Sequence, residues 1–146
     1  MNEIKFYREG DDYGYFSNFY FSPIQLKGKI WRTSEHYFQA QKFAGTRHER
    51  EIRKAVSPSK AARLGRSRSK PLRKDWERIK DNVMRTCLYA KFTQHEDLKQ
   101  KLLDTGDAIL IEHTHNDSYW ADGGVGSGKN MLGKLLMELR EKLRKS

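Results

Sequence analysis

The sequence has few of the features that define disulfide-rich, membrane-spanning or secreted proteins. Its one cysteine, Cys87, excludes an internal disulfide and any zinc site built on several cysteines. No apolar run approaches the ~20 residues that a membrane-spanning helix needs. The N-terminal segment also lacks the basic-then-apolar pattern of a secretion signal. These absences predict a cytoplasmic protein with no membrane partner.

Proline and linker sequences are scarce as well. The 146 residues include three prolines, and no repeat or Gly/Ser-rich linker divides them. A chain of this length fits one domain. Aromatic residues make up 12% of the chain, which argues against disorder because disordered chains lack them. A single domain spanning residues 1–146 is therefore predicted.

Acidic residues are outnumbered by basic ones. The 29 Lys and Arg residues against 19 Asp and Glu residues give a net charge of +10, which favours phosphorylated or polyanionic partners. Six cations and no acid lie between Arg63 and Lys74, with serine and glycine between them. This pattern suits contacts to phosphate groups. It lacks the interleaved aromatic residues that stack on single-stranded nucleic acid.

The pattern of apolar residues predicts a mainly α fold, an α-rich α+β domain with one small β-hairpin. Alternating residues predict strands over 4–7, 24–27 and 29–31, the last two joined at Gly28 as a hairpin. Capping signals and helical periodicity predict the helices. They cover about residues 34–44, 46–56, 57–65, 75–90, 95–103 and 130–145, with one isolated strand over 108–111.

Three polar residues of the first predicted helix fall on one face. Glu35, Gln39 and Lys42 are spaced i, i+4 and i+7. A carboxylate and an ammonium on one face can act together as acid or base and as nucleophile or phosphate anchor. The alternative is a polar stripe that faces solvent.

The longest predicted helix begins with a tryptophan. Trp76 heads an apolar stripe that includes Cys87. It is either a core residue or a ring on which a heterocyclic base stacks. Cys87 lies within the stripe, which favours a core residue over a nucleophile.

A glycine-rich segment precedes the last helix. Residues 123–129 satisfy G-x4-G-K, but Asn130 stands where a P-loop needs Ser or Thr for Mg²⁺, so an NTPase is not favoured. A glycine loop that opens a helix can still present N–H groups to an anion. Asp117 and Asp122 add carboxylates beside it. His113 and His115 are expected to be ordinary polar residues rather than metal ligands.

Five stretches together resemble the NADAR superfamily, and most closely its YbiA-like N-glycosidases. They are residues 11–14, 16–19, 33–43, 66–74 with Trp76, and 112–133, which span almost the whole chain in order. Each stretch alone is modest, whereas their order and spacing are specific. Ala121 departs from the pattern, because relatives often carry glycine there.

The resemblance implies hydrolysis of an N-glycosidic bond without a metal or cofactor. YbiA-like members split phosphoribosylated aminopyrimidine intermediates of riboflavin biosynthesis and release ribose 5-phosphate, and other members remove ADP-ribose from guanine in nucleic acid. Carried over by motif, the catalytic residues would be Glu35, Lys42 and Asp122. The substrate-binding residues would be Asn18, Trp76, Asp117, Trp120, Lys129 and Asn130.

The residue types suit that reaction. Cleavage of the C1′–N bond develops positive charge on the ribose, which a carboxylate stabilises. Glu35 or Asp122 would activate water, or Lys42 would attack C1′ and form a Schiff base. Trp76 would stack on the leaving base, and the basic stretch or the glycine loop would hold the 5-phosphate. Glu35, Trp76 and Asp122 are predicted to line one cleft.

Two other functions are weighed against this one. The first is an ADP-ribosyl-guanine glycohydrolase that acts on modified nucleic acid. The second is a basic nucleic-acid-binding module without catalysis. The acidic residues beside the glycine loop and on the Glu35 helix argue against the second.

Overall fold

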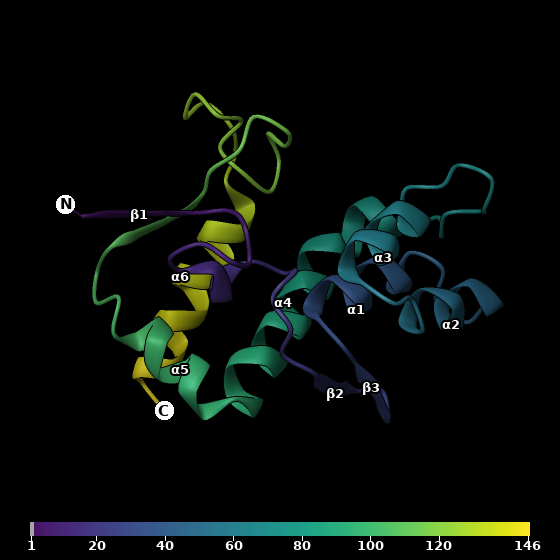
Figure 1. The fold of residues 1–146 in the computed structure, drawn as a ribbon, viewed down its shortest axis with the longest axis horizontal. Helices are drawn as coiled ribbons and strands as arrows, with labels where there is room; N and C mark the ends of the chain where they lie inside the picture. Colours follow the sequence, from purple (N-terminus) through teal and green to yellow (C-terminus); the bar gives the residue numbers. More distant parts are fainter. Residues whose placement is uncertain (1) are drawn as a thin grey trace. The chain divides into compact units, whose positions relative to one another are not determined.

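A computed structural model describes residues 2–146, and Met1 lies outside the described part. The chain divides into two compact units, each described by itself: unit 1 comprises Met1–Tyr20 and His95–Ser146, and unit 2 comprises Phe21–Gln94. Within residues 2–146 there are six α-helices, one short 3-10 helix and two two-stranded sheets (Figure 1). The mainly α fold with small β elements is thus confirmed, whereas the single domain stays a prediction.

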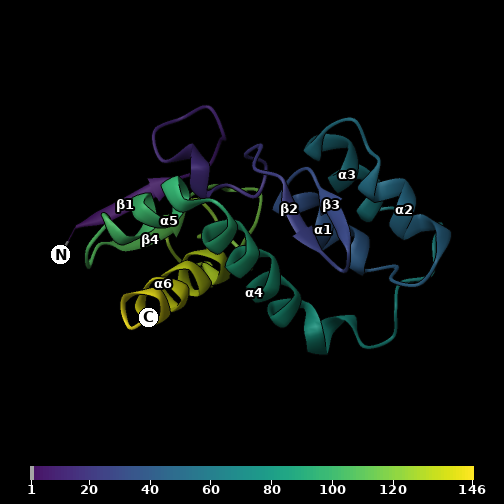
Figure 2. The ribbon, with the colours of Figure 1, turned by 90° about the horizontal axis from the view of Figure 1, so that it is seen from below.

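Unit 2 consists of a hairpin and four helices. Strands β2 (Ile24–Leu26) and β3 (Lys29–Trp31) pair antiparallel (Figure 2). Lys27 and Gly28 between them have φ angles of 57° and 71°, as expected of a tight two-residue hairpin turn. The helices that follow are α1 (Ser34–Gln41), α2 (Arg47–Arg53), α3 (Pro58–Gly65) and α4 (Trp76–Gln94).

Helix α1 is the central element of unit 2. The Thr33 hydroxyl accepts the N–H of His36 and so caps the first turn. Helices α2, α3 and α4 all pack against α1, and each of its eight residues is buried. Its polar residues therefore lie inside the unit, unlike those of an ordinary surface helix.

Unit 1 combines a parallel strand pair with two helices and the 3-10 helix. Strand β1 (Glu3–Phe6) pairs with β4 (Ile109–Glu112). The other elements are η1 (Gly14–Phe16), α5 (Glu96–Leu103) and α6 (Met131–Arg144). Both strands are predicted from the sequence, whereas their pairing and η1 are not. Figure 1 shows the long segment between β4 and α6 extending beyond the first turn of α6.

Helix α6 and the glycine-rich segment are fixed to β4. Gly133 lies so close to the Leu110 carbonyl that a Cβ would overlap it. The Asn130 side chain accepts the N–H of Glu112 at 3.0 Å and donates to the carbonyl of Leu110 at 2.9 Å. The amide of Asn130 thus takes the place of a neighbouring strand along the open edge of β4.

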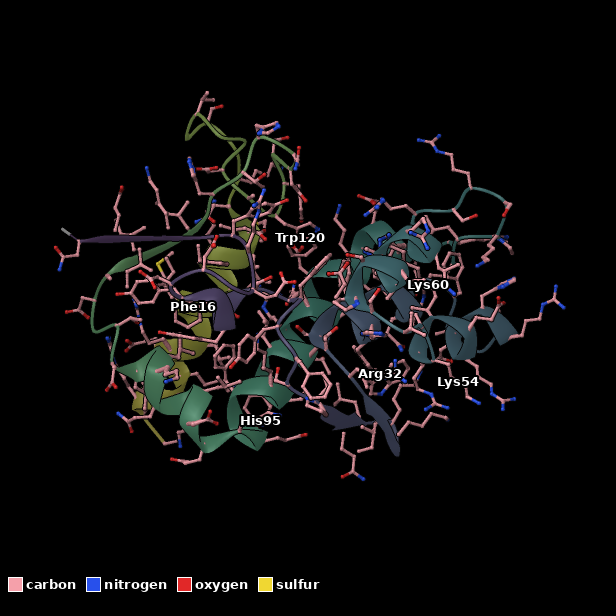
Figure 3. The ribbon with its side chains drawn as sticks, in the orientation of Figure 1. Phe16, Arg32, Lys54, Lys60, His95 and Trp120 are labelled. Carbon is pink, nitrogen blue, oxygen red and sulfur yellow. The ribbon has the colours of Figure 1, made fainter. Side chains whose placement is uncertain are left out.

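The excess of positive over negative charge lies in unit 2. Of the 29 Lys and Arg residues, 19 fall in unit 2 with six of the 19 acids, which gives +13. Unit 1 has the other ten cations and 13 acids, which gives −3. Lys54, directly after α2, and Lys60 of α3 are two of the cations of unit 2 (Figure 3). In residues 2–146 no helix is long and apolar enough to cross a membrane.

Candidate functional site

Glu35 and Gln39 form a buried polar pair on α1. Glu35 is 9% exposed and Gln39 is 7% exposed. The Gln39 amide donates from Nε2 to Oε2 of Glu35 at 2.8 Å. The polar residues of α1 are therefore not a solvated stripe, and a buried carboxylate needs such a donor. This burial favours the functional interpretation of the pair.

Lys42 follows the pair at the end of α1. Its Nζ donates to the carbonyl of Gly65 at 3.3 Å and lies 5.9 Å from the centre of the Trp76 ring. Burial lowers the pKa of Lys42 from its ordinary value of 10.5, while the nearby Glu35 acts to raise it and Arg66 to lower it. A lysine with a lowered pKa has a larger neutral fraction, which is the nucleophilic form.

Trp76 packs in the interior of the chain. It is 4% exposed, and its ring meets Phe38 edge-on with 5.1 Å between ring centres. Burial to this degree favours the core interpretation over an open stacking surface for a base. Trp76 therefore contributes an aromatic surface that lies next to the ammonium group of Lys42.

The basic stretch is attached to the end of α1. The N–H of Arg73 donates to the carbonyl of Lys42 at 3.1 Å, and its guanidinium donates to the carbonyl of Gln41 at 3.3 Å. Asp75 accepts from the same guanidinium at 2.6 and 3.1 Å. Arg73 therefore anchors the end of the basic stretch to the end of α1.

Asp122 in unit 1 accepts three hydrogen bonds. The donors are Nδ1 of His113 at 2.7 Å, the N–H of Gly124 at 2.8 Å and the N–H of Thr114 at 3.2 Å. Burial alone would raise the pKa of Asp122, but these donors outweigh it and hold the pKa below the ordinary 3.8. A carboxylate so stabilised is a weak base, so the expected role in activating water is not favoured. Asp122 holds the loop in place.

Asp117 shapes the same loop. Its Oδ1 accepts the N–H groups of Tyr119 and Trp120, both at 2.8 Å, as in an Asx turn. Trp120, labelled in Figure 3, packs edge-on against Tyr119 with 5.0 Å between ring centres. The Lys129 ammonium lies 5.4 Å from the centre of the Tyr119 ring.

Most N–H groups of the glycine-rich loop are already used within unit 1, which disfavours the loop as the phosphate site. The N–H groups of Met131 and Leu132, at the start of α6, donate to the carbonyls of Tyr119 and Trp120 at 3.0 and 3.1 Å. Further N–H groups of the loop donate within unit 1, namely those of Gly123, Gly124, Gly126, Gly128, Lys129 and Asn130. Since these donors are already used, the basic stretch of unit 2 is the better phosphate candidate.

The expected site residues fall in both units. Glu35, Lys42 and Trp76 belong to unit 2, where the electrostatic contact of Lys42 with Glu35 and its position over the Trp76 ring bring the three together. The others belong to unit 1: Asn18, Asp117, Trp120, Asp122, Lys129 and Asn130. Asn18 is 8% exposed and lies two residues after the end of η1. The cleft expected to contain Glu35, Trp76 and Asp122 stays a prediction.

Sequence reasoning missed a second lysine with unusual chemistry. Lys91 is fully buried one helical turn after Cys87, and burial lowers its pKa to about 7. The available signal is the position of Lys91 one turn after Cys87, a residue of the apolar stripe of α4. Cys87 is also fully buried, which raises its pKa to about 12 and confirms that it is a core residue.

Comparisons with known proteins cover almost the whole chain. The NADAR domain family matches residues 5–144. The N-glycosidase YbiA of Escherichia coli is 61% identical over 140 residues, which cover 96% of this chain and 88% of the relative. A riboflavin biosynthesis protein of Vibrio vulnificus is 43% identical over 96% of this chain and 38% of its own length. The NMR structure of E. coli YbiA superposes with a TM-score of 0.91 at 60% identity, covering 99% of this chain and 86% of that one.

Proposed function

The chain belongs to the NADAR domain family, and we propose that it is an N-glycosidase that releases ribose 5-phosphate from phosphoribosylated aminopyrimidines. One observation carries the proposal: α1 holds a buried carboxylate, Glu35, two turns before Lys42, an amine whose pKa is lowered by burial. The names of the relatives support N-glycosidase chemistry, and riboflavin biosynthesis appears in the name of the Vibrio vulnificus relative.

Lys42 is the nucleophile in the proposed reaction. Its neutral amine attacks C1′ of the ribose, and the bond between C1′ and the base nitrogen breaks with its electron pair going to the base, which takes up a proton from solvent. The new ammonium loses a proton to Glu35, which passes it to solvent. The C1′–O4′ bond then breaks with its electron pair going to O4′, which takes up a proton from solvent, and the opened sugar is held as a Schiff base. Water then hydrolyses the Schiff base, which frees ribose 5-phosphate and restores Lys42.

Glu35 has two tasks in this scheme. Its carboxylate stabilises the positive charge that develops on the ribose as the C1′–N bond breaks. It then accepts the proton that Lys42 releases. Both tasks require the ionised form, which suits a carboxylate that accepts a hydrogen bond from Gln39.

The 5-phosphate is assigned to the basic stretch. Arg66 and Arg68 are exposed, and Arg73 anchors the stretch to the end of α1. Two or three fixed donors suffice for one phosphate. The remaining cations of unit 2 would raise the rate at which an anionic metabolite is captured.

The residues of unit 1 enter the proposal on the family motif. Asn18, Trp120, Lys129 and Asn130 are assigned to substrate contacts, and Asp117 and Asp122 to shaping the loop that carries Trp120. The hydrogen bonds of the two aspartates support that division of roles.

A second candidate is removal of ADP-ribose from guanine in nucleic acid. The net charge of +13 in unit 2 favours it, because a polyanion would use far more cations than one phosphate needs. The buried Glu35 and Lys42 serve either substrate equally well, so the choice rests on the leaving base and on the polymer.

The two candidates separate in one assay. The protein is incubated with phosphoribosylated aminopyrimidines, with their dephosphorylated forms and with DNA that carries ADP-ribosylated guanine, and released sugars are measured. We expect ribose 5-phosphate from the first substrate and little turnover of the second. Faster turnover of the DNA would promote the second candidate. Salt-dependent DNA binding without any release would indicate a binding module instead.

A further inference from the structure

The Gln39 side chain is held in one orientation. It is 7% exposed, its Nε2 donates to Glu35, and its Oε1 is buried without a hydrogen-bond partner among residues 2–146. An unpartnered buried oxygen is costly, so this orientation needs a physical cause.

Gly65 supplies that cause. A Cβ at Gly65 would overlap Oε1 and the side-chain carbons of Gln39, so the amide fills the space that any other residue would occupy. Turning the amide around would place the two N–H groups of Nε2 there instead. A buried N–H group without an acceptor is rarer and less tolerated than a buried oxygen without a donor. The amide therefore keeps its N–H groups toward Glu35.

A donor fixed toward a carboxyl group favours its ionised form, because the hydrogen bond to a carboxylate oxygen is charge-assisted and stronger than one to the neutral acid. Lys42 from α1 and Cys87 from α4 also interact electrostatically with Glu35. The Lys42 cation favours the carboxylate as well, and the buried Cys87 thiol is neutral at physiological pH. Gly65 thus has two contacts here: its carbonyl oxygen accepts a hydrogen bond from Lys42, and its lack of a side chain leaves room for the Gln39 amide.

We propose that Gln39, backed by Gly65, is a positioning residue that holds Glu35 ionised, so that Glu35 accepts the proton of Lys42 and releases it to solvent and not to the leaving base. This inference rests on the proposed N-glycosidase function. It assigns Glu35 to charge stabilisation and proton acceptance, and it excludes Glu35 as the acid that protonates the leaving base.

The test replaces Gln39 and uses a matched control on the same helix. Gln41 is also a buried glutamine of α1, and its amide donates to Glu49 at 3.0 Å instead of to Glu35. Gln39→Met and Gln41→Met remove similar amides from the interior. We expect Gln39→Met to move the acidic limb of the kcat profile upward by about one pH unit with little change in KM. Gln41→Met keeps the limb in place.

A second variant strengthens the test. Gln39→Glu places another carboxyl group beside Glu35, so the two share a proton and the acidic limb moves upward further than in Gln39→Met. Acidic limbs that coincide in wild type, Gln39→Met and Gln41→Met would overturn the proposal.

A spectroscopic measurement separates this inference from the proposed function. The side-chain ¹³C signal of Glu35, identified by its loss in Glu35→Gln, is titrated in wild type and in Gln39→Glu. We expect ionisation at lower pH in wild type, even if no N-glycosidase activity is found. Identical titration of the Glu35 signal in both proteins would refute the inference, including in the case where Gln39→Met fails to fold.

Discussion

Nδ1 of His113 and Oδ2 of Asp122 lie 2.7 Å apart, and this pair joins the end of β4 to the glycine-rich loop. The two backbone N–H groups that Asp122 also accepts, from Thr114 and Gly124, come from the same two segments. One carboxylate thus fixes the path of the chain on both sides of Trp120.

Asp122→Asn is expected to lower the free energy of unfolding by about 1–3 kcal/mol, since hydrogen bonds to a buried charged acceptor are lost. Because the pKa of Asp122 is lowered by folding, its contribution is complete above the ordinary pKa of 3.8 and is lost as pH falls below it. Urea unfolding at pH 7 and pH 3 checks this: the difference between the two proteins should be smaller at pH 3 than at pH 7.

Asp107→Asn is the control for this experiment. The Asp107 side chain is 85% exposed, and its ion pair with Arg144 spans 3.0 Å. Exposed ion pairs contribute little, so the variant should unfold like wild type at pH 7. Equal losses of unfolding free energy in the two variants would show that the buried hydrogen bonds of Asp122 contribute no more than an exposed ion pair.

Borohydride reduction during turnover is expected to attach the opened ribose phosphate to Lys42. The neutral amine of Lys42 forms the Schiff base that borohydride reduces. Lys91 also has a lowered pKa, so the modified peptide must be identified by mass spectrometry. Lys42→Met should abolish the adduct. An adduct on Lys91 would identify Lys91, and not Lys42, as the nucleophile. Turnover without any adduct would favour direct attack by water.

Glu35→Gln is expected to keep the fold and to reduce kcat by about 10²–10⁴-fold, the usual loss for an acid–base residue. Full activity of this variant would remove Glu35 from the mechanism. Thermal unfolding of both proteins provides the necessary check on the fold.

Burial of Lys91 predicts a stability that rises with pH. Its pKa is 10.5 when exposed and about 7 in the folded chain, so between these values only the unfolded chain holds the proton. Stability must then increase with pH across that window. The free energy of unfolding of wild type, relative to Lys91→Met, should therefore be higher at pH 9.5 than at pH 7. A constant difference between the two proteins would contradict the lowered pKa.

Local signals in the sequence predicted most of the elements. Gly28 marks the turn between β2 and β3, and Thr33 marks the start of α1, because both act on their own neighbours in the chain. The pairing of β1 with β4 was not predicted. Those strands are more than a hundred residues apart, and nothing in either strand specifies its partner.

The sequence predicted which residue types form the candidate site, but it did not predict how buried those residues are. Spacing placed Glu35, Gln39 and Lys42 on one face but could not tell a buried face from a solvated one, because that depends on α2, α3 and α4 packing around α1. The sequence could not show which N–H groups of the glycine loop are already used, for a similar reason. Its N–H groups are used by carbonyls of Tyr119 and Trp120, whose position depends on the Asp117 turn.

Phosphate recognition by the basic stretch gives a prediction that separates fixed contacts from general attraction. Arg68→Gln is expected to raise KM for the phosphorylated substrate about tenfold, as a charge-assisted hydrogen bond is lost, and to leave kcat unchanged. KM for the dephosphorylated substrate should not change. Arg66→Gln should raise KM similarly and also shift the pH profile, because Arg66 helps to lower the pKa of Lys42.

The matched control removes the same charge elsewhere in unit 2. Arg50 lies on α2 and is exposed, as Arg68 is. Arg50→Gln should reduce only the long-range attraction of anions, so its small effect on KM should disappear at high salt. The effect of Arg68→Gln should persist in 0.5 M salt, because a direct contact to phosphate is screened less. Equal and salt-sensitive effects of the two variants would mean that the basic stretch attracts the substrate without binding its phosphate.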